Sequence, residues 1–259
     1  MDLGIAGRKA IVCASSRGLG KGCAMALAQA GCTVVVNGLD PERLAATASD
    51  IAKATGATVI PVAANVSTRA GQDAILAACP EPDILINNNG GPPPRGFREI
   101  DRDAMLDGVI QNMVTPIELI QRVIDGMIAR RFGRIINITS ASVLTPLVGL
   151  DLSSGARAGL TAFLAGAARE VAHANVTINA VLPGMFDTDR LTHSTKRMAE
   201  MGKVDADTMR RNRMATVPAG RFGHVDEFGQ LCAFLASAHA GYITGQNILI
   251  DGGTFRASF

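Results

Sequence analysis

Seven short runs of β-branched and aliphatic residues recur along the chain, and longer segments with apolar residues at helical spacing lie between them. Such runs are typical of buried strands, and the segments between them are typical of amphipathic helices. Regular alternation of this kind requires right-handed crossovers, so we predict an α/β fold: one doubly wound domain over residues 1–259, with a seven-stranded parallel sheet and helices on both faces. The strands are expected near Ala10, Thr33, Ala57, Asp83, Arg134, Val176 and Gln246, and the clearest helices over residues 20–30, 41–55, 104–130 and 154–172.

Two segments interrupt this alternation, and each follows the C-terminal end of an expected strand. Residues 87–96 contain three consecutive prolines, which favour an extended conformation. Residues 184–219 are a long insertion that is rich in Met and Arg. Because ligands bind outside the carboxyl ends of strands in open α/β sheets, we expect both segments to flank the active site. We interpret residues 184–219 as a substrate lid, with a plain surface loop as the alternative.

Composition and charge narrow the class of partner. The chain is 47% hydrophobic and has a net charge of +2, which favours a small-molecule partner over nucleic acid or a membrane surface. The five cysteines form no Cys-x-x-Cys pair and have no histidine at metal-ligand spacing, so we expect neither a metal site nor a redox pair. Without a signal-peptide pattern or an apolar run of membrane-spanning length, a cytoplasmic location is expected.

A glycine turn follows the first expected strand and leads into an alanine-rich helical segment. Glycines at 18 and 20 let the backbone approach a pyrophosphate at the positive N-terminal end of that helix. The strand before the turn, the helix after it and a second strand that ends near the expected ribose together predict a dinucleotide-binding site of the Rossmann type. A purely structural turn is the alternative. The segment reads Ala14-Ser15-Ser16-Arg17-Gly18-Leu19-Gly20.

The end of the second expected strand bears on the choice between NADP and NAD. Gly38 occupies the place where NAD-dependent enzymes carry an acidic residue for the ribose. No carboxylate opposes a 2′-phosphate there, and Arg17 could pair with one. We therefore predict NADP as the cofactor, with NAD as the alternative because Asp40 lies close by.

Over its whole length the chain resembles the classical short-chain dehydrogenases/reductases, particularly the 3-oxoacyl-[acyl-carrier-protein] reductases. The family's glycine motif G-x-x-x-G-x-G falls on residues 14–20, with alanine in place of the first glycine, and its N-N-A-G falls on residues 87–90, with asparagine in place of alanine. Its acidic residue near the adenine falls on Asn65, and its P-G-x-x-x-T is intact at residues 183–188. The resemblance implies cofactor contacts from Ser15, Ser16, Arg17, Gly18, Leu19, Gly20, Asn65, Val66, Asn88, Asn89, Gly90, Arg157, Pro183, Gly184, Phe186 and Thr188.

The resemblance also points to the catalytic positions, and two of them hold unusual residues. The family uses Asn, Ser, Tyr and Lys, with the serine thirteen residues before the tyrosine and the lysine four after it. Asn112 and Ser140 match the first two, whereas the same spacing places Ser153 and Arg157 at the Tyr and Lys positions. The only tyrosine, Tyr242, lies near the last expected strand.

These two replacements change how a carbonyl could be reduced, because the developing alkoxide needs a proton and a charge-stabilising donor. A serine hydroxyl is a weaker acid than tyrosine and is shorter by roughly 4 Å, so it would need a bridging water. Arg157 keeps the positive charge but does not release a proton in a relay. Our hypothesis is that Arg157 stabilises the alkoxide, water supplies the proton and Ser140 orients the substrate oxygen.

Other candidates each have a plainer alternative. Pro116 leaves the Asn112 carbonyl without its helical N–H partner, so that carbonyl could hold a water, or the helix could simply kink. Asp151 could be an acid or base, although a solvated helix cap is the more usual role. The basic cluster Arg210, Arg211 and Arg213 could meet an acidic carrier or a phosphate, or could form a solvated helix face.

Two classes of function remain. The first is an NAD(P)-dependent oxidoreductase that acts on a ketone or secondary alcohol, such as a 3-oxoacyl thioester. The second is a catalytically silent dinucleotide-binding protein that serves as a sensor or structural partner; the loss of Tyr and Lys favours it, whereas the retained Asn112, Ser140 and Thr188 favour the enzyme. The resemblance implies a homotetramer or homodimer in which residues 104–130 and 154–172 pack against their copies.

Overall fold

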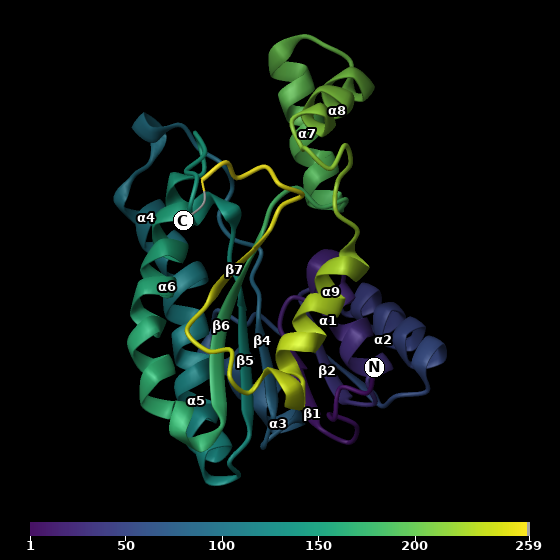
Figure 1. The fold of residues 1–259 in the computed structure, drawn as a ribbon. Coiled ribbons are helices and arrows are strands. Elements are labelled where there is room, and N and C mark those ends of the chain that lie inside the picture. Colours follow the sequence, from purple (N-terminus) through teal and green to yellow (C-terminus); the bar gives the residue numbers. More distant parts are fainter. Residues whose placement is uncertain (258–259) are drawn as a thin grey trace.

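A seven-stranded parallel sheet with strand order β3-β2-β1-β4-β5-β6-β7 forms the centre of the molecule (Figure 1). The structure is a computed structural model that describes residues 1–257. The strand order reverses between β1 and β4, which is where open α/β sheets bind ligands. The predicted fold and all seven predicted strands are confirmed. The strands are β1 Lys9–Val12, β2 Thr33–Gly38, β3 Val59–Ala63, β4 Ile84–Asn87, β5 Gly133–Ile138, β6 Val176–Pro183 and β7 Asn247–Ile250.

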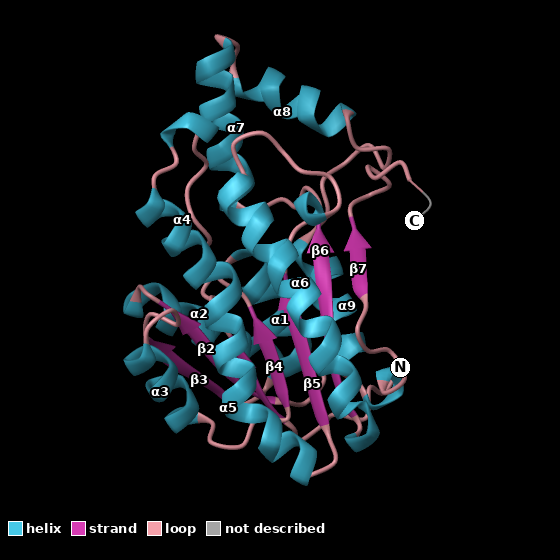
Figure 2. Ribbon diagram, turned by 90° about the vertical axis from the view of Figure 1, so that its left-hand side faces the viewer, coloured by secondary structure: helices cyan, strands magenta, loops and turns pink. Residues whose placement is uncertain are grey.

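Helices cover both faces of this sheet, and Figure 2 shows the strands between the two layers. Successive residues of β1 and β2 point to opposite faces and are buried on both, which explains why these strands read as continuous apolar runs. One face is covered by α1 Gly18–Gln29, α2 Pro41–Thr55 and α9 Val225–Ala236, and the other by α3 Arg69–Ala78, α5 Thr115–Ala129 and α6 Asp151–Val171. Short 3-10 turns occur at η1 Phe97–Glu99, η3 Ala141–Val143, η4 Ala172–Ala174 and η5 Ala238–Ala240.

Two glycines bring α1 and α9 into direct backbone contact. A Cβ at Gly22 would collide with the Val225 carbonyl oxygen, and a Cβ at Gly229 would collide with the Gly22 carbonyl oxygen. Neither position therefore accepts a side chain without separating the helices. This contact fixes the helix that begins at the glycine turn against the last helix of the chain.

The segment predicted as one helix over residues 104–130 is divided by a π-helical turn. It consists of α4 (Arg102–Val109), the π turn η2 (Ile110–Val114) and α5, and the Thr115 N–H donates to the Ile110 carbonyl. Pro116 has no N–H to continue the α-helical ladder, and the wider turn accommodates that loss. Asn112 lies at the centre of this turn.

Residues 184–219 contain two helices, so the plain-loop alternative is wrong. Figure 1 shows α7 (Asp189–Gly202) and α8 (Ala206–Ala215) above the C-terminal edge of the sheet. Thr188 caps α7 by accepting from the Leu191 N–H at 3.3 Å, and Asp205 caps α8 by accepting from the Thr208 N–H at 2.8 Å. The helical hairpin is thus specified by its own capping residues.

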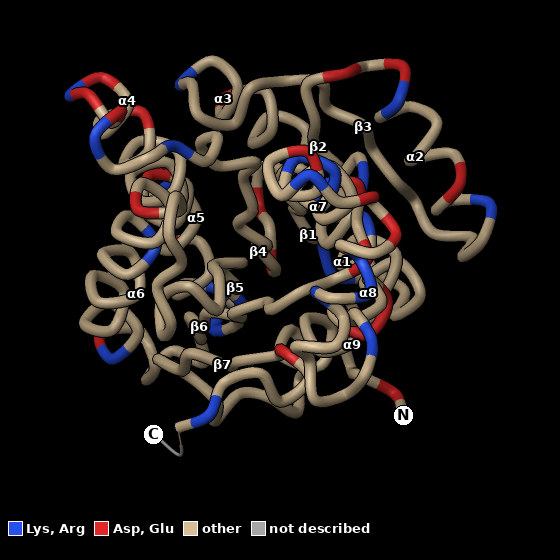
Figure 3. The backbone as a smooth tube through the Cα atoms, turned by 90° about the horizontal axis from the view of Figure 1, so that it is seen from above, with Lys and Arg blue, Asp and Glu red and all other residues tan. Residues whose placement is uncertain are grey.

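Basic and acidic residues are interspersed along the outer helices when the backbone is viewed from above (Figure 3). In the part of the chain that the structure describes, no helix combines the length and apolar character needed to cross a membrane. Within residues 1–257, no group of three or more His, Cys, Asp or Glu side chains could hold a metal ion.

All five cysteines are buried and unpaired, and burial raises the pKa of Cys13 and Cys32 to about 12.

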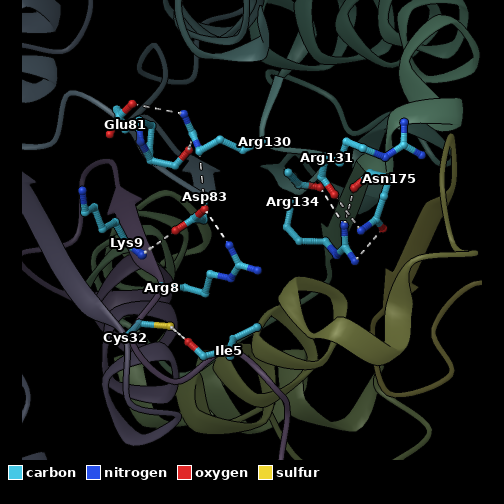
Figure 4. Close-up of polar contacts among 12 residues, drawn as sticks. Ile5, Arg8, Lys9, Cys32, Glu81, Asp83, Arg130, Arg131, Arg134 and Asn175 are labelled. Atoms are coloured by element: carbon cyan, nitrogen blue, oxygen red, sulfur yellow. Dashed lines mark hydrogen bonds and ion pairs between the residues drawn. The ribbon is translucent and has the colours of Figure 1, made fainter. Parts of the chain in front are cut away.

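Two polar clusters hold the opposite, N-terminal edge of the sheet together (Figure 4). In the first, the Asp83 carboxylate accepts from Arg8 Nη1 at 3.1 Å and from the Lys9 N–H at 3.0 Å. In the second, the Arg134 side chain is 1% exposed and donates to the Ser237 carbonyl at 3.0 Å. It also donates to the Gly133 and Asn175 carbonyls at 2.9 and 2.8 Å and to Asn175 Oδ1 at 3.2 Å.

We expect the substitution Arg134→Met to lower the free energy of unfolding by about 3–5 kcal/mol, because several buried acceptors lose their donor together. Urea unfolding followed by circular dichroism measures this change. Arg69→Met is the matched control, since Arg69 is 75% exposed and only pairs with Asp73 at 3.5 Å. Its effect should stay below about 1 kcal/mol. Equal effects in the two variants would contradict the role assigned to Arg134.

Candidate active site at the C-terminal edge of the sheet

The predicted site residues come together where β1, β4, β5 and β6 end. The glycine turn follows β1, and residues 88–96 follow β4 as a segment without regular secondary structure. Ser140 follows β5, and the segment that leads to α7 follows β6. The parallel sheet therefore brings four loops, distant in sequence, to one edge.

Hydrogen bonds from two buried polar residues shape the glycine turn. Ser15 Oγ donates to the Val12 carbonyl at 2.7 Å and accepts from the Asn37 N–H at 3.0 Å. Asn37 Oδ1 accepts from the Ala14 N–H at 3.2 Å, and its amide nitrogen donates to the Ala64 carbonyl at 2.9 Å. Asn37 thus connects the turn to the loop after β3. This role of Asn37 was not predicted, although a polar residue in an otherwise apolar strand was a sequence signal for it.

The glycines of the turn are required for different reasons. Gly18 has φ +57, a conformation that side chains disfavour, whereas a Cβ at Gly20 would collide with the Ala14 carbonyl oxygen. The first turn of α1 has no acidic residue and no side-chain cap, so its N–H groups are available to an anion. Open space lies next to Gly90, where no atom comes within 4 Å of the place that a Cβ would take. These features fit a dinucleotide with its diphosphate at the start of α1.

Leu19 and Ser16 face other parts of the molecule. The Leu19 side chain is partly buried and packs against the core under α1. The Ser16 carbonyl accepts from Thr47 Oγ1 at 2.8 Å, and Ser16 Oγ lies 3.1 Å from the place of a Cβ at Gly38. Any side chain at Gly38 would therefore press on Ser16.

The charged groups near Gly38 are already paired. Asp40 caps α2 by accepting from the Arg43 N–H at 3.1 Å. The exposed Arg17 pairs with Asp189 at 3.4 Å and so connects the glycine turn to the first turn of α7.

The asparagines after β4 fasten the neighbouring loops. Asn88 Nδ2 donates to the Ala14 carbonyl at 3.1 Å, and Asn89 Nδ2 donates to Ser67 Oγ at 2.8 Å and to the Gln111 carbonyl at 3.1 Å. Asn65 folds back on its own loop, since its Oδ1 accepts from the Ser67 N–H at 3.0 Å. Val66, the residue beside it, is 5% exposed in the core.

The segment after β6 lies against the glycine turn. Thr188 Cγ2 is 3.6 Å from the place of a Cβ at Gly18, and a Cβ at Gly184 would crowd Asp251. Pro183 is the last residue of β6. The Phe186 side chain is 5% exposed and packs edge-on against Phe228, with ring centroids 5.4 Å apart. Because this ring is largely covered, a cofactor contact from Phe186 would come mainly from its backbone.

Ser140, Ser153 and Arg157 lie around the end of β5. Arg157 Nη1 donates to the Ile138 carbonyl at 2.6 Å, and Arg157 Nε donates to Ser153 Oγ at 3.0 Å. Ser140 Oγ accepts from the N–H of Ser142 at 3.1 Å and from its hydroxyl at 2.8 Å. Since Ser140 and Ser153 act as acceptors in these bonds, each hydroxyl proton remains free to donate.

Arg157 is 6% exposed, and its partners are neutral. Burial and the nearby charge of Arg190 lower the pKa of Arg157 to about 10, so the guanidinium stays charged at neutral pH. A charge held away from water acts strongly on groups beside it. The arrangement can stabilise negative charge that develops on a bound molecule.

A cavity of about 20 Å³ lies beside Arg157 and Asn112. Within residues 1–257, three buried atoms that have no hydrogen-bond partner belong to residues that line it: Asn112 Oδ1, Asn87 Oδ1 and Thr115 Oγ1. The volume is sufficient for one water molecule, which needs two to four polar partners. The side-chain amide of Asn112, rather than its backbone carbonyl, therefore supplies the more direct evidence for a water at this position.

Two other sequence interpretations are refined, and one contact was not predicted. Leu150, not Asp151, occupies the N-cap of α6, and Asp151 lies exposed in the first turn. The basic cluster is engaged within the hairpin: Arg210 pairs with Asp187 at 2.8 Å, and Arg213 donates to Thr195 Oγ1 at 2.7 Å. Arg190, which sequence analysis did not single out, donates to the Gly90 carbonyl.

Comparisons with known proteins agree with this geometry. A family model described as enoyl-(acyl carrier protein) reductase matches residues 13–254. The chain is 32% identical to a 3-oxoacyl-[acyl-carrier-protein] reductase of Aquifex aeolicus, covering 98% of this chain and 100% of that protein. It is also 32% identical to the NADPH-dependent reductase BacG of Bacillus subtilis, covering 96% and 98%. The crystal structure of L-sorbose reductase from Gluconobacter frateurii, complexed with NADPH and L-sorbose, has a TM-score of 0.93 at 27% identity and covers 99% and 100%.

We expect Thr115→Val to lower the free energy of unfolding by about 1–3 kcal/mol, because a water in the cavity would lose a hydrogen-bond partner. Thermal and urea unfolding measure the change. Thr177→Val is the matched control, since Thr177 Oγ1 is also buried without a partner in the described chain but does not line this cavity. Thr177→Val should be neutral or stabilising. A stabilising effect of Thr115→Val would show that its hydroxyl has no water partner.

Proposed function

The chain belongs to the classical short-chain dehydrogenase/reductase family, and from this premise we propose that it is an NADP-dependent oxidoreductase that interconverts a ketone and a secondary alcohol. The observation that carries the proposal is the buried, charged Arg157 beside the free hydroxyl protons of Ser153 and Ser140. Charge of this kind, fixed where an alkoxide would form, is suited to carbonyl reduction.

The chain offers a fitting cradle for the dinucleotide. The free N–H groups at the start of α1 would hold the diphosphate, with Gly18 and Gly20 allowing close approach. The remainder of the dinucleotide would be bordered by Asn88, Asn89, Gly90 and Thr188, together with the backbone of residues 183–186. Arg157 would contact the ribose next to the nicotinamide. When bound, NADPH would supply the hydride that adds to the carbonyl carbon.

Several contacts support NADP over NAD. Gly38 has no carboxylate, and the space beside it is taken by Ser16. Asp40, which was the reason to keep NAD as an alternative, is engaged in capping α2. Arg17 is exposed next to the glycine turn, where a 2′-phosphate could compete with Asp189 for its guanidinium.

The chemistry that we propose assigns a separate task to each polar group. Ser140 orients the carbonyl oxygen with its free O–H, and Arg157 stabilises the negative charge that this oxygen acquires. A water held by Ser153 transfers the proton that completes the alcohol, because Ser153 is too short for direct donation. The cavity at Asn112, which Arg157 also lines, would connect this water to a second one.

The hairpin α7–α8 is proposed as the substrate lid. Its first turn touches both walls of the cleft, through Arg17 and through Gly90. A cavity of about 170 Å³ beneath its base leaves room for movement. Met198 and Met201 are 41% and 68% exposed on α7 and could cover an apolar part of the substrate.

A homotetramer or homodimer is proposed from the outer helices. Leu106, Val109 and Ile110 expose apolar side chains on α4 and the π turn, and Phe163 on α6 is 53% exposed. Exposed apolar patches commonly mark protein interfaces.

The cofactor assignment predicts that NADPH raises the midpoint of thermal unfolding of the purified protein by several degrees and that NADH does so much less. A ligand that binds only the native state stabilises it in proportion to the logarithm of its concentration over Kd. The reverse order would show that Asp40 or the loop around it selects NAD. No shift with either cofactor would refute the oxidoreductase proposal.

The role of Arg157 predicts a separation between activity and stability. Arg157→Met should reduce NADPH-dependent carbonyl reduction by about 100-fold or more, because the charge stabilisation of the alkoxide is lost. Its free energy of unfolding should fall by only about 1–3 kcal/mol, since the Ile138 carbonyl and Ser153 Oγ each lose one donor and the protein stays folded. Steady-state rates and urea unfolding are measured on the same sample. If no substrate is turned over by the wild type although NADPH binds, the catalytically silent alternative replaces the enzyme proposal.

A further inference from the structure

Two arginines reach the same dipeptide in the cleft. Arg190, in the first turn of α7, donates through Nη1 to the Gly90 carbonyl. Arg157 Nη2, which comes from α6, lies 3.5 Å from the place of a Cβ at Gly91. The two guanidinium groups therefore approach neighbouring residues from different helices, one from the lid and one from the wall of the site.

The two positive charges are not balanced by carboxylates. Within residues 1–257, neither Arg157 nor Arg190 forms an ion pair. The two acidic residues just before Arg190 in the sequence form ion pairs with other arginines. Asp187 pairs with Arg210 at 2.8 Å, and Asp189 pairs with Arg17 at 3.4 Å. Partial desolvation lowers the pKa of Arg190, and the pKa of Arg157 is lowered by burial and by the charge of Arg190.

Both side chains also have donors to spare. A guanidinium carries five N–H groups, of which Arg157 uses two and Arg190 uses one in the hydrogen bonds described above. Arg190 is exposed at the mouth of the cleft, so a ligand can reach it from solvent. A carboxylate offers two oxygens that accept from two such donors at once, and its charge would balance part of the pair.

We propose that Arg157 and Arg190 together bind a carboxylate of the substrate, which makes the substrate an oxo acid and the product a hydroxy acid. The inference rests on the proposed function, because it places the carboxylate next to the reacting carbonyl. A neutral ketone or an ester would leave the two charges unbalanced. The cofactor diphosphate is a different source of anionic oxygens, but the free N–H groups at the start of α1 already provide for it.

The test compares acids with their neutral esters on the protein saturated with NADP⁺. Acetoacetate and 2-oxobutanoate are titrated against methyl acetoacetate and methyl 2-oxobutanoate, and binding is followed by calorimetry and thermal shift. The variant is Arg190→Gln, and the matched control is Arg197→Gln on the same helix, whose exposed side chain forms no hydrogen bond in the described part of the chain. NADP⁺ affinity is measured for each protein separately.

The acids should bind the wild type and Arg197→Gln more tightly than the esters do. Arg190→Gln should weaken acid binding by about 10- to 100-fold, which is the loss of one charge-assisted hydrogen bond, and should leave NADP⁺ affinity nearly unchanged. Equal binding of acids and esters by the wild type would overturn the proposal. The proposal would also be overturned if Arg190→Gln lost NADP⁺ affinity but kept the wild-type affinities for the acids and the esters. Arg190 would then bind the cofactor diphosphate.

The outcome for the proposed function is separate. Acid binding that depends on Arg190 in a protein that shows no shift with NADPH or NADP⁺ would support the carboxylate site and refute the oxidoreductase. A thermal shift with NADP⁺ but equal binding of acids and esters would support the cofactor site and refute the carboxylate site.

Discussion

The bond from the Arg157 guanidinium to the Ile138 carbonyl places a permanent positive charge at the C-terminal end of β5, away from water, and the surrounding site is arranged around that charge. Ser153 accepts from the same group, Asn112 and the water-sized cavity lie beside it, and Arg190 adds a second charge from the first turn of α7. A lysine at this position would be a compact donor on a flexible stem, whereas the planar guanidinium can hold the strand end and the serine simultaneously. Ser153 and Arg157 therefore form one hydrogen-bonded unit at the end of β5.

The glycine turn and the C-terminal end of β5 are kept in position by polar residues inside the sheet. Asn87 Nδ2 donates to Asn137 Oδ1 at 3.0 Å, and Asn137 Nδ2 donates to the Asn179 carbonyl at 3.2 Å. These bonds join β4, β5 and β6 just below the site. Together with Asn37 and Ser15 at the glycine turn, they hold the candidate site residues on the same sheet, as the proposed reaction requires, since small errors of position reduce the rate of a reaction strongly.

Much of the fold followed from local pattern. The inner strands β1, β2, β4, β5 and β6 could be predicted because they are almost entirely buried and read as apolar runs, and the more exposed edge strands β3 and β7 still carry short aliphatic runs. The helix α2 could be placed because Asp40 caps it and Gly56 ends it at φ 73. The π turn at Asn112 could not be predicted in the same way, since Pro116 is compatible with a kink, a break or a wider turn. The meeting of Arg190 with Gly90 and the inward packing of Phe186 depend on how α7 is set above the sheet, and no spacing in the sequence encodes such long-range geometry.

The backbone contact between α1 and α9 has a consequence for biosynthesis. Gly22 lies near the beginning of the chain and Gly229 near its end, so the helix that starts at the cofactor turn gains its closest neighbour only after nearly the whole polypeptide has left the ribosome. Until then the apolar face of α1 that α9 covers is exposed to other nascent chains. A truncated product without α9 would therefore be a candidate for chaperone binding and degradation, even though it contains the whole glycine turn.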